Sequence, residues 1–183
     1  IAVIAAVGTT VNVYNNGELI GTTSVGNDGR WSFIPDPALP DGAYSITARV
    51  EDAAGNLSNP TTAVDFTVDT VPPAVATVTI IDNEGTPTPV TNGFTNDTTP
   101  QLTGTGNAEG DIVSVYDTNQ QLLGTGVVQA DGSWSIQLPT LSPTQHTLTV
   151  IVTDEIGNSS TTTVGITIDT TAPEPLTNVT IES

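Results

Sequence analysis

The second half of this sequence repeats the first at a distance of about 100 residues. The segment Asp28-Gly-Arg-Trp-Ser32 returns as Asp131-Gly-Ser-Trp-Ser135, and Val11-Asn-Val-Tyr14 returns as Val113-Ser-Val-Tyr116. A fixed period in a sequence reflects a structural unit that is repeated along the chain. Because about 100 residues suffice for a small domain, we expect each copy of the repeat to fold as a domain of its own.

The phase of the repeat divides the 183 residues into three parts. We predict a first unit over residues 1–70 that is incomplete at its N-terminal side. A complete second unit is predicted over residues 71–170. Residues 171–183 are predicted to form a linker and the first strand of a following repeat. We therefore expect the sequence to be an internal piece of a longer tandem array.

Two segments near the ends of the sequence are predicted strands without a complete sheet around them. The first unit keeps only part of its second strand, at Ala2-Val-Ile-Ala5, and so exposes the backbone of a sheet edge. Thr177-Asn-Val-Thr-Ile181 repeats Ala76-Thr-Val-Thr-Ile80 and is a first strand with no sandwich behind it. Two outcomes are expected for this last strand: pairing with the first unit of another molecule, or fraying, as is common at chain termini.

Alternation of apolar and polar residues predicts β-strands throughout the complete unit. For example, Val164, Ile166 and Ile168 alternate with Gly165 and Thr167. Turn sequences such as Ala-Asp-Gly separate the alternating segments, and no segment is typical of a helix. The predicted strands span residues 76–82, 100–106, 111–117, 121–129, 132–138, 145–154 and 160–169. Seven short strands in about 100 residues predict an all-β fold of tandem immunoglobulin-like β-sandwiches.

The composition limits the partners that such a protein can have. The 20 Asp and Glu residues stand against Arg30 and Arg49, so the formal net charge is −18. This charge repels nucleic acid and anionic membranes, and we expect neither as a partner. Cysteine is absent, so packing alone must hold each core. No apolar run approaches the roughly 18 residues of a membrane helix, so no membrane insertion is expected.

Several short motifs follow one another in a characteristic order. They are Asp-Asn-Glu-Gly, Asn-Asp-Thr-Thr-Pro-x-Leu-Thr-Gly-Thr, Ala-Glu-Gly-Asp, Val-Tyr-Asp, Asp-Gly-x-Trp-Ser and Thr-Asp-x-x-Gly-Asn. Together they resemble the bacterial immunoglobulin-like repeat of giant surface adhesins and biofilm-associated proteins. The resemblance covers nearly the whole chain. It implies a tandem array, secretion to the bacterial cell surface, and a spacer or stalk role in adhesion.

The resemblance also implies calcium, because several arrays of this family bind calcium at their domain junctions. The positions that match acidic positions of the family are Asp52, Asp69, Glu109, Asp154 and Asp169. The first unit departs from the pattern, because its Ala6-Val-Gly-Thr9 has no acidic residue where the second unit has Glu109 and Asp111. A calcium site at the leading end of the first unit is therefore not expected.

The placement of the acidic residues in a sandwich leads to the same expectation. In an immunoglobulin-like topology, the end of one unit should face the loops at the start of the next unit. The two predicted ligand sets are Asp69 with Glu109, Asp111 and Asp154, and Asp169 with Asp82, Glu84 and Asp97. Carboxylates that converge on one joint repel each other unless a cation neutralises them, and Ca²⁺ prefers oxygen ligands. The alternative is that these acidic loops only keep a secreted protein soluble.

Neither an enzyme nor a sugar-binding face is predicted. His146 occupies the position of Tyr44 in the other repeat, which indicates strand packing rather than catalysis. A serine nucleophile needs a base and an orienting acid, and a glycosidase needs a cleft between paired carboxylates. Trp31 and Trp134 stand at the same place in each unit, which favours core packing over a platform for stacking sugars.

The predicted function is that of a structural spacer or stalk segment of a large bacterial cell-surface adhesin. It would present a distal binding region for cell adhesion or biofilm formation, with calcium rigidifying the joints between repeats. The expected partners are neighbouring repeats and, through the full-length protein, a host surface or other cells. The alternative is a ligand-binding module that recognises a glycan or host protein through its tip loops. A spacer repeats its loops from unit to unit, as this sequence does, whereas a binder carries one divergent loop.

Overall fold

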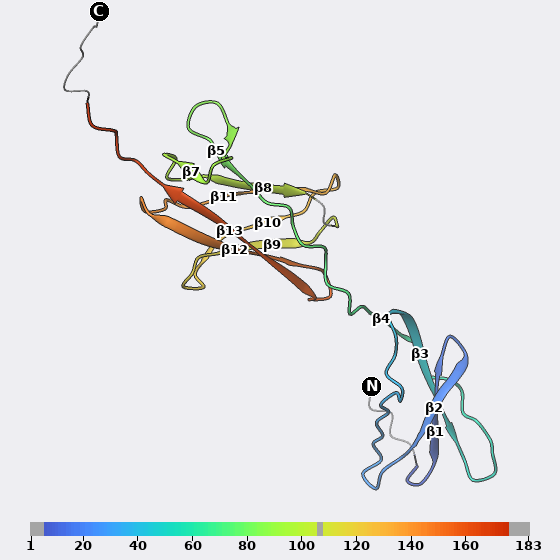
Figure 1. Ribbon diagram of the computed structural model, residues 1–183. Helices are drawn as coiled ribbons and strands as arrows, with labels where there is room; N and C mark the ends of the chain where they lie inside the picture. Colours follow the sequence, from blue (N-terminus) through green and yellow to red (C-terminus); the bar gives the residue numbers. More distant parts are fainter. Residues whose placement is uncertain (1–5, 106–107, 176–183) are drawn as a thin grey trace, which may run out of the picture. The chain divides into compact units, whose positions relative to one another are not determined.

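Every regular element in residues 6–105 and 108–175, which the computed structural model describes, is a β-strand. The predicted all-β class is confirmed. The chain divides into two units, unit 1 (Ile1–Thr70) and unit 2 (Val71–Ser183) (Figure 1). Within the described ranges, no helix is long and apolar enough to cross a membrane. The strands predicted at Ala2-Val-Ile-Ala5 and Thr177-Asn-Val-Thr-Ile181 lie outside the described residues.

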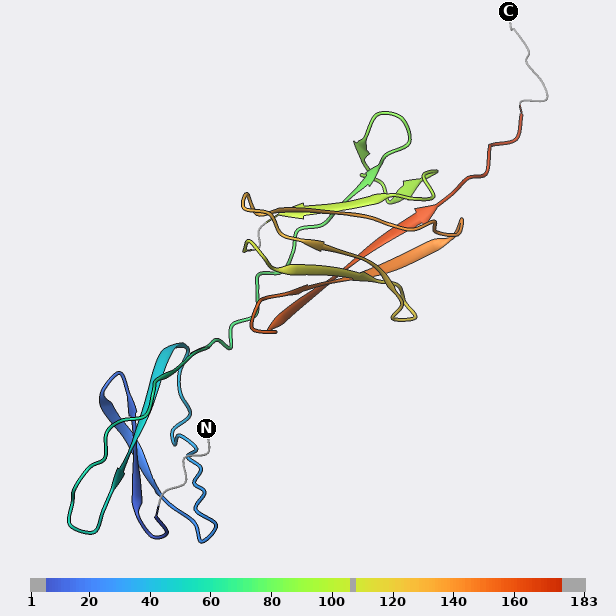
Figure 2. The ribbon, with the colours of Figure 1, turned by 180° about the vertical axis from the view of Figure 1, so that it is seen from behind.

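Unit 2 is a sandwich of two packed sheets (Figures 1 and 2). One sheet has the strand order β10-β9-β12-β13-β7, and the other has the order β11-β8-β5-β6. Neighbouring strands are antiparallel, except that β7 and β13 pair in parallel. The strands are β5 (Thr79–Asp82), β6 (Thr88–Pro89), β7 (Phe94–Thr95), β8 (Gln101–Thr105), β9 (Ile112–Tyr116), β10 (Leu122–Val127), β11 (Ser133–Gln137), β12 (Gln145–Thr153) and β13 (Ser159–Ile168).

All seven strands predicted for the complete unit are present in unit 2. The sequence analysis missed β6 and β7, which are two residues long each. Alternation cannot show in so short a segment, and β7 is defined only by its contact with the end of β13. The predicted sandwich is therefore correct for unit 2, with β6 and β7 as additions at the sheet edges.

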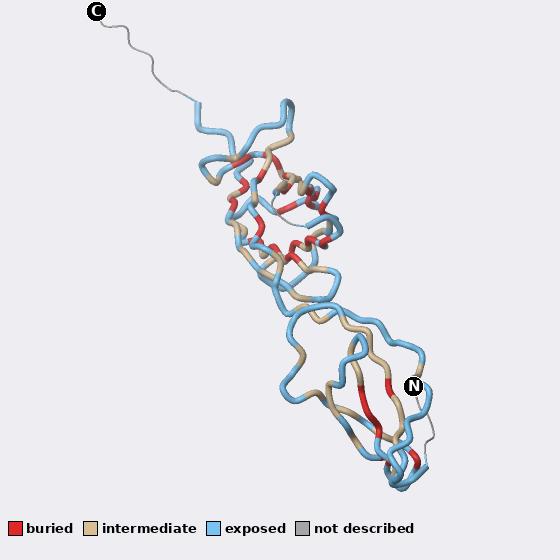
Figure 3. Tube along the Cα trace, turned by 90° about the vertical axis from the view of Figure 1, so that its right-hand side faces the viewer, coloured by how far each residue is buried: buried red, intermediate tan, exposed pale blue. Residues whose placement is uncertain are grey.

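The core of unit 2 lies between its two sheets (Figure 3). Leu102 of β8, Val113 of β9 and Leu148 of β12 are fully buried. In β12, Val150 and Val152 continue the buried row at every second position, as the alternation predicts. Burying one such side chain stabilises a fold by roughly 1.5–3 kcal/mol. A continuous aliphatic core of this kind holds unit 2 together without a disulfide.

Trp134 of β11 lies opposite Gly104 of β8, and this pair sets how closely the two strands pack. A Cβ atom on Gly104 would lie 2.0 Å from the carbonyl oxygen of Thr77. It would also lie 2.4 and 2.5 Å from two ring atoms of Trp134. Only glycine fits such a close approach. Trp134 is 3% exposed, which confirms that it is a core residue.

Unit 1 contains a single sheet within its described residues, of order β2-β1-β3-β4. Its strands are β1 (Thr10–Asn15), β2 (Glu18–Ser24), β3 (Gly42–Glu51) and β4 (Val64–Val68). By the sequence repeat they correspond to β9, β10, β12 and β13. These are four strands within residues 6–70, fewer than the seven or so predicted for a complete repeat. Residues 30–34 repeat β11 but form no strand, because no counterpart of β8 pairs with them in the described part of unit 1.

Strand β4 is half as long as β13 because unit 1 carries extra residues at this point. Five residues separate Ser58 from Val64, whereas three separate Ser160 from Val164. The additional residues bring in Pro60, which has no N–H group to donate to the neighbouring strand. The proline therefore interrupts in unit 1 the long strand that unit 2 forms without a break.

Candidate functional site

The predicted ligands of unit 2 lie near the two ends of strand β13. This strand is ten residues long, about 33 Å in an extended chain. Near its start, the Ser160 hydroxyl donates a hydrogen bond to the Ala74 carbonyl at 3.1 Å. Just after its end, the Asp169 N–H donates to the Thr95 carbonyl at 2.9 Å. We name these the linker end (around Ala74 and Ser160) and the exit end (around Thr95 and Asp169).

Glu109, Asp111 and Asp154 lie at the linker end. Asp154 stands in the turn between β12 and β13. Glu109 and Asp111 precede β9, whose first residue pairs with the last residue of β12. The fold thus brings these three predicted ligands to one end of unit 2. The fourth member of the set, Asp69, follows β4 in unit 1, so the set draws on both units.

The carboxylate of Asp154 is engaged by its own turn. It accepts hydrogen bonds from the N–H groups of Ile156, Gly157 and Asn158, and from the Asn158 side chain, at 2.7 to 3.0 Å. Partial desolvation raises the pKa of Asp154, but the hydrogen bonds outweigh it and the pKa is lowered overall. Asp154 therefore has a structural role, because its carboxylate satisfies the donors of a tight turn.

The matching turn of unit 1 is built in the same way. Asp52 accepts hydrogen bonds from the N–H groups of Ala54 and Asn56 and from the Asn56 side chain, each at 2.9 Å. The side-chain bond from Asn56 is the main cause that lowers the pKa of Asp52. The sequence analysis took the aspartate as a possible ligand and missed the asparagine. The asparagine could have been found from the sequence, because it stands four residues after the aspartate in both Asp-x-x-Gly-Asn segments.

Asp111 and Glu109 differ in exposure. Asp111 is 5% exposed, and its carboxylate accepts a hydrogen bond from the Ala108 N–H at 3.2 Å. Its carbonyl accepts a second bond from the Val128 N–H at 2.9 Å. Glu109 is exposed in the turn that leads to β9. Asp111 thus fixes the start of β9, whereas Glu109 is accessible to an ion or a neighbouring repeat.

Asp97 at the exit end is the most deeply buried acidic residue of the described chain, at 0% exposed. It accepts hydrogen bonds from the N–H groups of Asn83 at 2.9 Å and Thr99 at 2.7 Å. The Asn83 side chain donates to Gln137 at 2.8 Å, and Gln137 donates to the Thr99 carbonyl. These bonds offset the cost of burying a carboxylate and join β11 to two loops.

Thr95 connects the other acidic residues of the exit end. Its hydroxyl donates to Asp82 at 2.6 Å and accepts from the Asp97 N–H at 3.1 Å. Its carbonyl accepts from the Asp169 N–H, as noted above. Glu84 is exposed, and its N–H donates to Asp82 at 3.0 Å. The fold thus places the second predicted set around Thr95, a residue that no sequence pattern singled out.

None of these sets forms a ready-made metal site within the described residues. There, no three or more His, Cys, Asp or Glu side chains are grouped so that they could hold a metal ion. Calcium takes about six to eight oxygen ligands, which the carboxylates of unit 2 do not supply alone. The aspartates of these sets in unit 2 (Asp82, Asp97, Asp111, Asp154 and Asp169) instead accept hydrogen bonds from backbone or side-chain groups of unit 2. Calcium at the joint, with Asp69 from unit 1, remains a prediction.

His146 and Tyr44 make the same hydrogen bond in their two units. Tyr44 donates from its hydroxyl to the Pro40 carbonyl at 2.7 Å. The Nε2 atom of His146 bonds to the Ser142 carbonyl at 2.8 Å. A tyrosine that bonds back to the chain a few residues upstream is a known device of immunoglobulin-like sandwiches. The histidine takes over this structural role at the start of β12.

A family model of the bacterial Ig-like domain matches residues 2–70 and residues 72–170. The chain belongs to the bacterial Ig-like domain family. The predicted resemblance and the predicted sandwich are thus confirmed. Bacterial Ig-like domains of adhesins are typically non-enzymatic structural modules.

Several solved structures contain domains similar to these two bacterial Ig-like domains. A Ca²⁺-stabilized adhesin that helps an Antarctic bacterium reach out and bind ice is 30% identical, with a TM-score of 0.41; the match covers 90% of this chain and 40% of that one. The BSP domain of a biofilm-associated protein is 28% identical, with a TM-score of 0.36 and coverages of 91% and 26%. A 1.5-MDa bacterial ice-binding adhesin is 29% identical, with a TM-score of 0.39 and coverages of 91% and 55%. The chain thus spans less than two thirds of each of these relatives, and no curated protein matches it.

Acid is expected to destabilise both Ig-like domains. The pKa values of Asp52, Asp131 and Asp154 are lowered in the fold, for Asp131 mainly by the hydrogen bond from the Ser133 side chain. A carboxylate whose folded pKa lies below its ordinary value of 3.8 stabilises the fold above that pH. This stabilisation is lost as the pH falls through the folded pKa. Thermal midpoints measured from about pH 6 to about pH 2 should therefore drop steeply at the acidic end.

The turn of unit 2 provides a matched pair of variants for this test. Asp154→Ala should lower the midpoint of unit 2 at neutral pH and reduce its loss in acid. Glu155→Gln, in the same turn and exposed, should change neither. A midpoint that stays level down to the lowest pH, or an equal response of the two variants, would contradict this role of the turn carboxylates.

Proposed function

We propose that this chain is a spacer segment of a large bacterial cell-surface adhesin, and that it holds a distal binding region away from the cell. The observation that carries this proposal is the opposite placement of the two ends of unit 2. The chain arrives at the linker end, beside Ser160, and leaves at the exit end, after Ile168. A domain built in this way adds its own length to a tandem array.

The two Ig-like units also share their turns, which supports a spacer over a binding module. Asp52 and Asp154 organise the same turn with the same partners. Tyr44 and His146 make equivalent bonds at the start of β3 and β12. A binding module would be expected to carry one loop that differs strongly from its counterpart. No observation on the described residues favours recognition of a glycan or host protein.

Calcium at the joints between repeats is the finer part of the proposal. At the joint between units 1 and 2, the proposed ligands are Asp69, Glu109, Asp111 and Asp154. At the exit end, Asp169 would act with Asp82, Glu84, Asp97 and oxygens of a following repeat. The formal net charge is −18, so carboxylates that meet at a joint repel one another and attract cations. Glu84 and Glu109 are exposed and accessible to an ion.

Calcium is expected to stabilise the chain and to narrow its distribution of shapes. An ion that binds only the folded state adds about 2.7 kcal/mol at a hundredfold excess over its Kd. We expect a higher thermal midpoint in millimolar calcium than in chelator. Small-angle scattering should show an elongated particle in both conditions, with a larger and better defined maximum dimension in calcium.

Two variants test whether the calcium effect depends on the joint or on the negative surface charge in general. Asp69→Ala should abolish the calcium effect on the scattering profile without unfolding either unit. Glu18→Gln, which removes one exposed charge from β2, should leave the effect intact. Identical midpoints and profiles in calcium and chelator would overturn the calcium joints. A compact particle in both conditions would overturn the spacer.

A further inference from the structure

The five-stranded sheet of unit 2 has an outer surface without charged side chains across four of its strands. In β9 and β12, alternate side chains such as Val113 and Val150 point into the core, so the positions between them point outward. Strand pairing aligns the outward positions of β10, β9, β12 and β13 in three rows. The rows are Val127, Ile112, Thr153 and Ser159; Thr125, Ser114, Ile151 and Thr161; and Leu122, Tyr116, Thr149 and Thr163. We name these residues the uncharged face, because the four strands contain no Asp, Glu, Lys or Arg.

Apolar side chains protrude from the uncharged face. Ile112, Leu122 and Val127 are 45%, 50% and 49% exposed. Ile151 and Tyr116 are half-buried, and all other members of the face are Thr or Ser. Single exposed apolar side chains are common on protein surfaces, but these five lie on adjacent rows of one sheet. A partner can cover such a surface without burying an unpaired charge.

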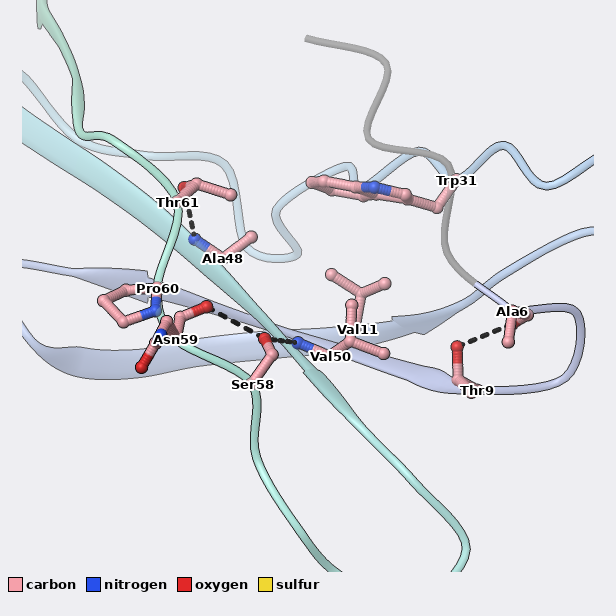
Figure 4. A pocket seen from close by; sticks show the side chains of 10 residues that line it. All are labelled: Ala6, Thr9, Val11, Trp31, Ala48, Val50, Ser58, Asn59, Pro60 and Thr61. Atoms are coloured by element: carbon pink, nitrogen blue, oxygen red, sulfur yellow. Dashed lines mark hydrogen bonds between the residues drawn. The ribbon is translucent and has the colours of Figure 1, made fainter.

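The matching surface of unit 1 is identified by its core residues. Val11, Ala48 and Val50 line a hollow beside Trp31 on the inner side of the sheet (Figure 4). The residues next to them in β1 and β3 therefore lie on the outer side of the sheet. This outer side is the counterpart of the uncharged face, because β1 to β4 correspond to β9, β10, β12 and β13 in the sequence repeat.

The outer side of the sheet in unit 1 is polar and carries charged residues. Unit 1 replaces four members of the uncharged face: Ile112 by Thr10, Val127 by Ser24, Ile151 by Arg49 and Thr153 by Glu51. The carboxylate of Glu51 accepts a hydrogen bond from the Asn12 side chain at 2.7 Å. The same sheet thus forms with polar residues at these positions. The fold does not require the apolar side chains of unit 2 there, which indicates a role other than folding.

The acidic residues of unit 2 lie around this face and not on it. Within the described residues of unit 2, Asp82 ends β5 and every other acidic residue stands outside the strands. Asp111, Asp117 and Asp154 border the face, and their carboxylates accept hydrogen bonds from their own turns. Unit 2 contains no Lys or Arg. It therefore presents a centre of apolar and hydroxyl groups with a negatively charged border.

We propose that the uncharged face of unit 2 binds the same face of a second copy of the chain. A contact of one surface with itself is closed by a two-fold axis. It places the apolar and hydroxyl groups of one copy against the same groups of the other. A partner that binds through charge would find none on this face, whereas a second copy needs none. Two molecules with a formal net charge of −18 can meet here without bringing their acidic turns into the centre of the contact.

The size of this sheet surface indicates a weak contact. The β12–β13 ladder contains nine residue pairs, which extend about 30 Å along the strands, and four strands span about 15–20 Å. Roughly 500 Å² per copy, or about 1,000 Å² in total, is at the lower limit for a specific interface. One pair of units would therefore associate only transiently. Many chains side by side on a surface would gain strength from the number of such contacts.

Sedimentation of the whole chain over a concentration series tests this contact. A chelator is present throughout, so that the proposed calcium joints do not contribute and the two proposals are tested separately. We expect reversible dimers, whose association constant should rise by about threefold or more between about 20 mM and about 500 mM NaCl. Salt screens the repulsion between the acidic borders but leaves the apolar contact intact.

Two arginine variants locate the contact. Ile151→Arg introduces the residue that unit 1 has at this position, and it should weaken the dimer by about tenfold or more, because the charge is left unpaired in the contact. Ile156→Arg adds the same charge at a 54% exposed residue of the turn between β12 and β13, and it should change the association by less than about twofold. The double variant Ile112→Thr/Val127→Ser, again with the residues of unit 1, should weaken the dimer without a change of charge. Circular dichroism checks that each variant is folded.

A single introduced cysteine shows which surfaces meet, because the chain has none of its own. Ser114→Cys lies in the middle row of the uncharged face. Ser135→Cys lies on the outer surface of the other sheet, between the core residues Trp134 and Ile136. A flexible thiol cross-linker should join Ser114→Cys chains several times faster than Ser135→Cys chains. Any of four results would overturn the proposal: monomers at every concentration, dimers that weaken with salt, equal association of the two arginine variants, or equal cross-linking of the two cysteine variants.

Discussion

Replacement of Gly104 by alanine is expected to lower the thermal midpoint of unit 2 by about 10 °C or more. The added Cβ atom would lie 2.0 Å from the Thr77 carbonyl oxygen, and a backbone atom cannot rotate out of the way. Trp134 blocks the same space from the other side. Overpacking of a well-filled core typically costs about 1–3 kcal/mol and sometimes more. In a domain of this size, each kcal/mol corresponds to roughly 4–8 °C.

Gly165→Ala provides the matched control. A Cβ atom at Gly165 of β13 would meet only the His146 carbonyl, at 3.9 Å, which is an ordinary contact. This variant should keep the wild-type midpoint within a few degrees. Scanning calorimetry on the full chain measures both. Equal midpoints for the two alanine variants would show that β8 and β5 can separate and that position 104 does not limit their packing.

Truncation of a core residue is expected to cost unit 2 more than unit 1. Leu148→Ala removes a fully buried side chain of β12, and such changes cost about 2–5 kcal/mol. Ile46→Ala changes the corresponding residue of β3, which is half-buried and lines an open hollow. Water can enter the space left at position 46, so we expect less than about half the cost.

Denaturant unfolding of the two variants, followed by circular dichroism, provides the comparison. Two transitions are expected because the units are separate, and each variant should move only one of them. A cost at Ile46 as large as that at Leu148 would mean that the core of unit 1 is closed in solution.

The strands of unit 2 could be predicted from the sequence because alternation is a direct consequence of strand geometry. Side chains at every second position of a strand point to the same face, so Leu148, Val150 and Val152 all face the core. The short strand β7 could not be predicted in this way. It exists because β13 continues far enough to pair with Phe94 and Thr95, and that length depends on the whole sheet.

The single sheet of unit 1 depends on tertiary structure in the same way. Residues 30–34 have the sequence of a strand, and their counterpart in unit 2 is one. A strand exists only with a partner, and sequence pattern says nothing about whether the partner is in place. The repeat thus predicts which residues correspond in the two units, but not which of them pair in the described residues 6–70.

The candidate ligands show which chemistry a sequence leaves unresolved. The repeat placed Asp154 and Asp97 near domain ends, and the fold agrees. Asp154 is engaged by Asn158, four residues away, and Asp97 by Asn83 and Thr99. An aspartate that accepts hydrogen bonds from its own turn and an aspartate that binds a metal ion cannot be distinguished in a sequence. Only the positions of the donors distinguish them.

The route of the chain through unit 2 has a mechanical consequence. A pull on the two linkers acts along β13, whose nine-pair ladder with β12 runs over most of its length. The hydrogen bonds of an antiparallel ladder lie across the strands, so this force shears them together and does not peel them apart one at a time. The parallel contact between β7 and β13 at the exit end is loaded in the same direction. Tension in a tethered array would thus be shared by many hydrogen bonds of unit 2 at once, and the ladder would resist stretching as a whole.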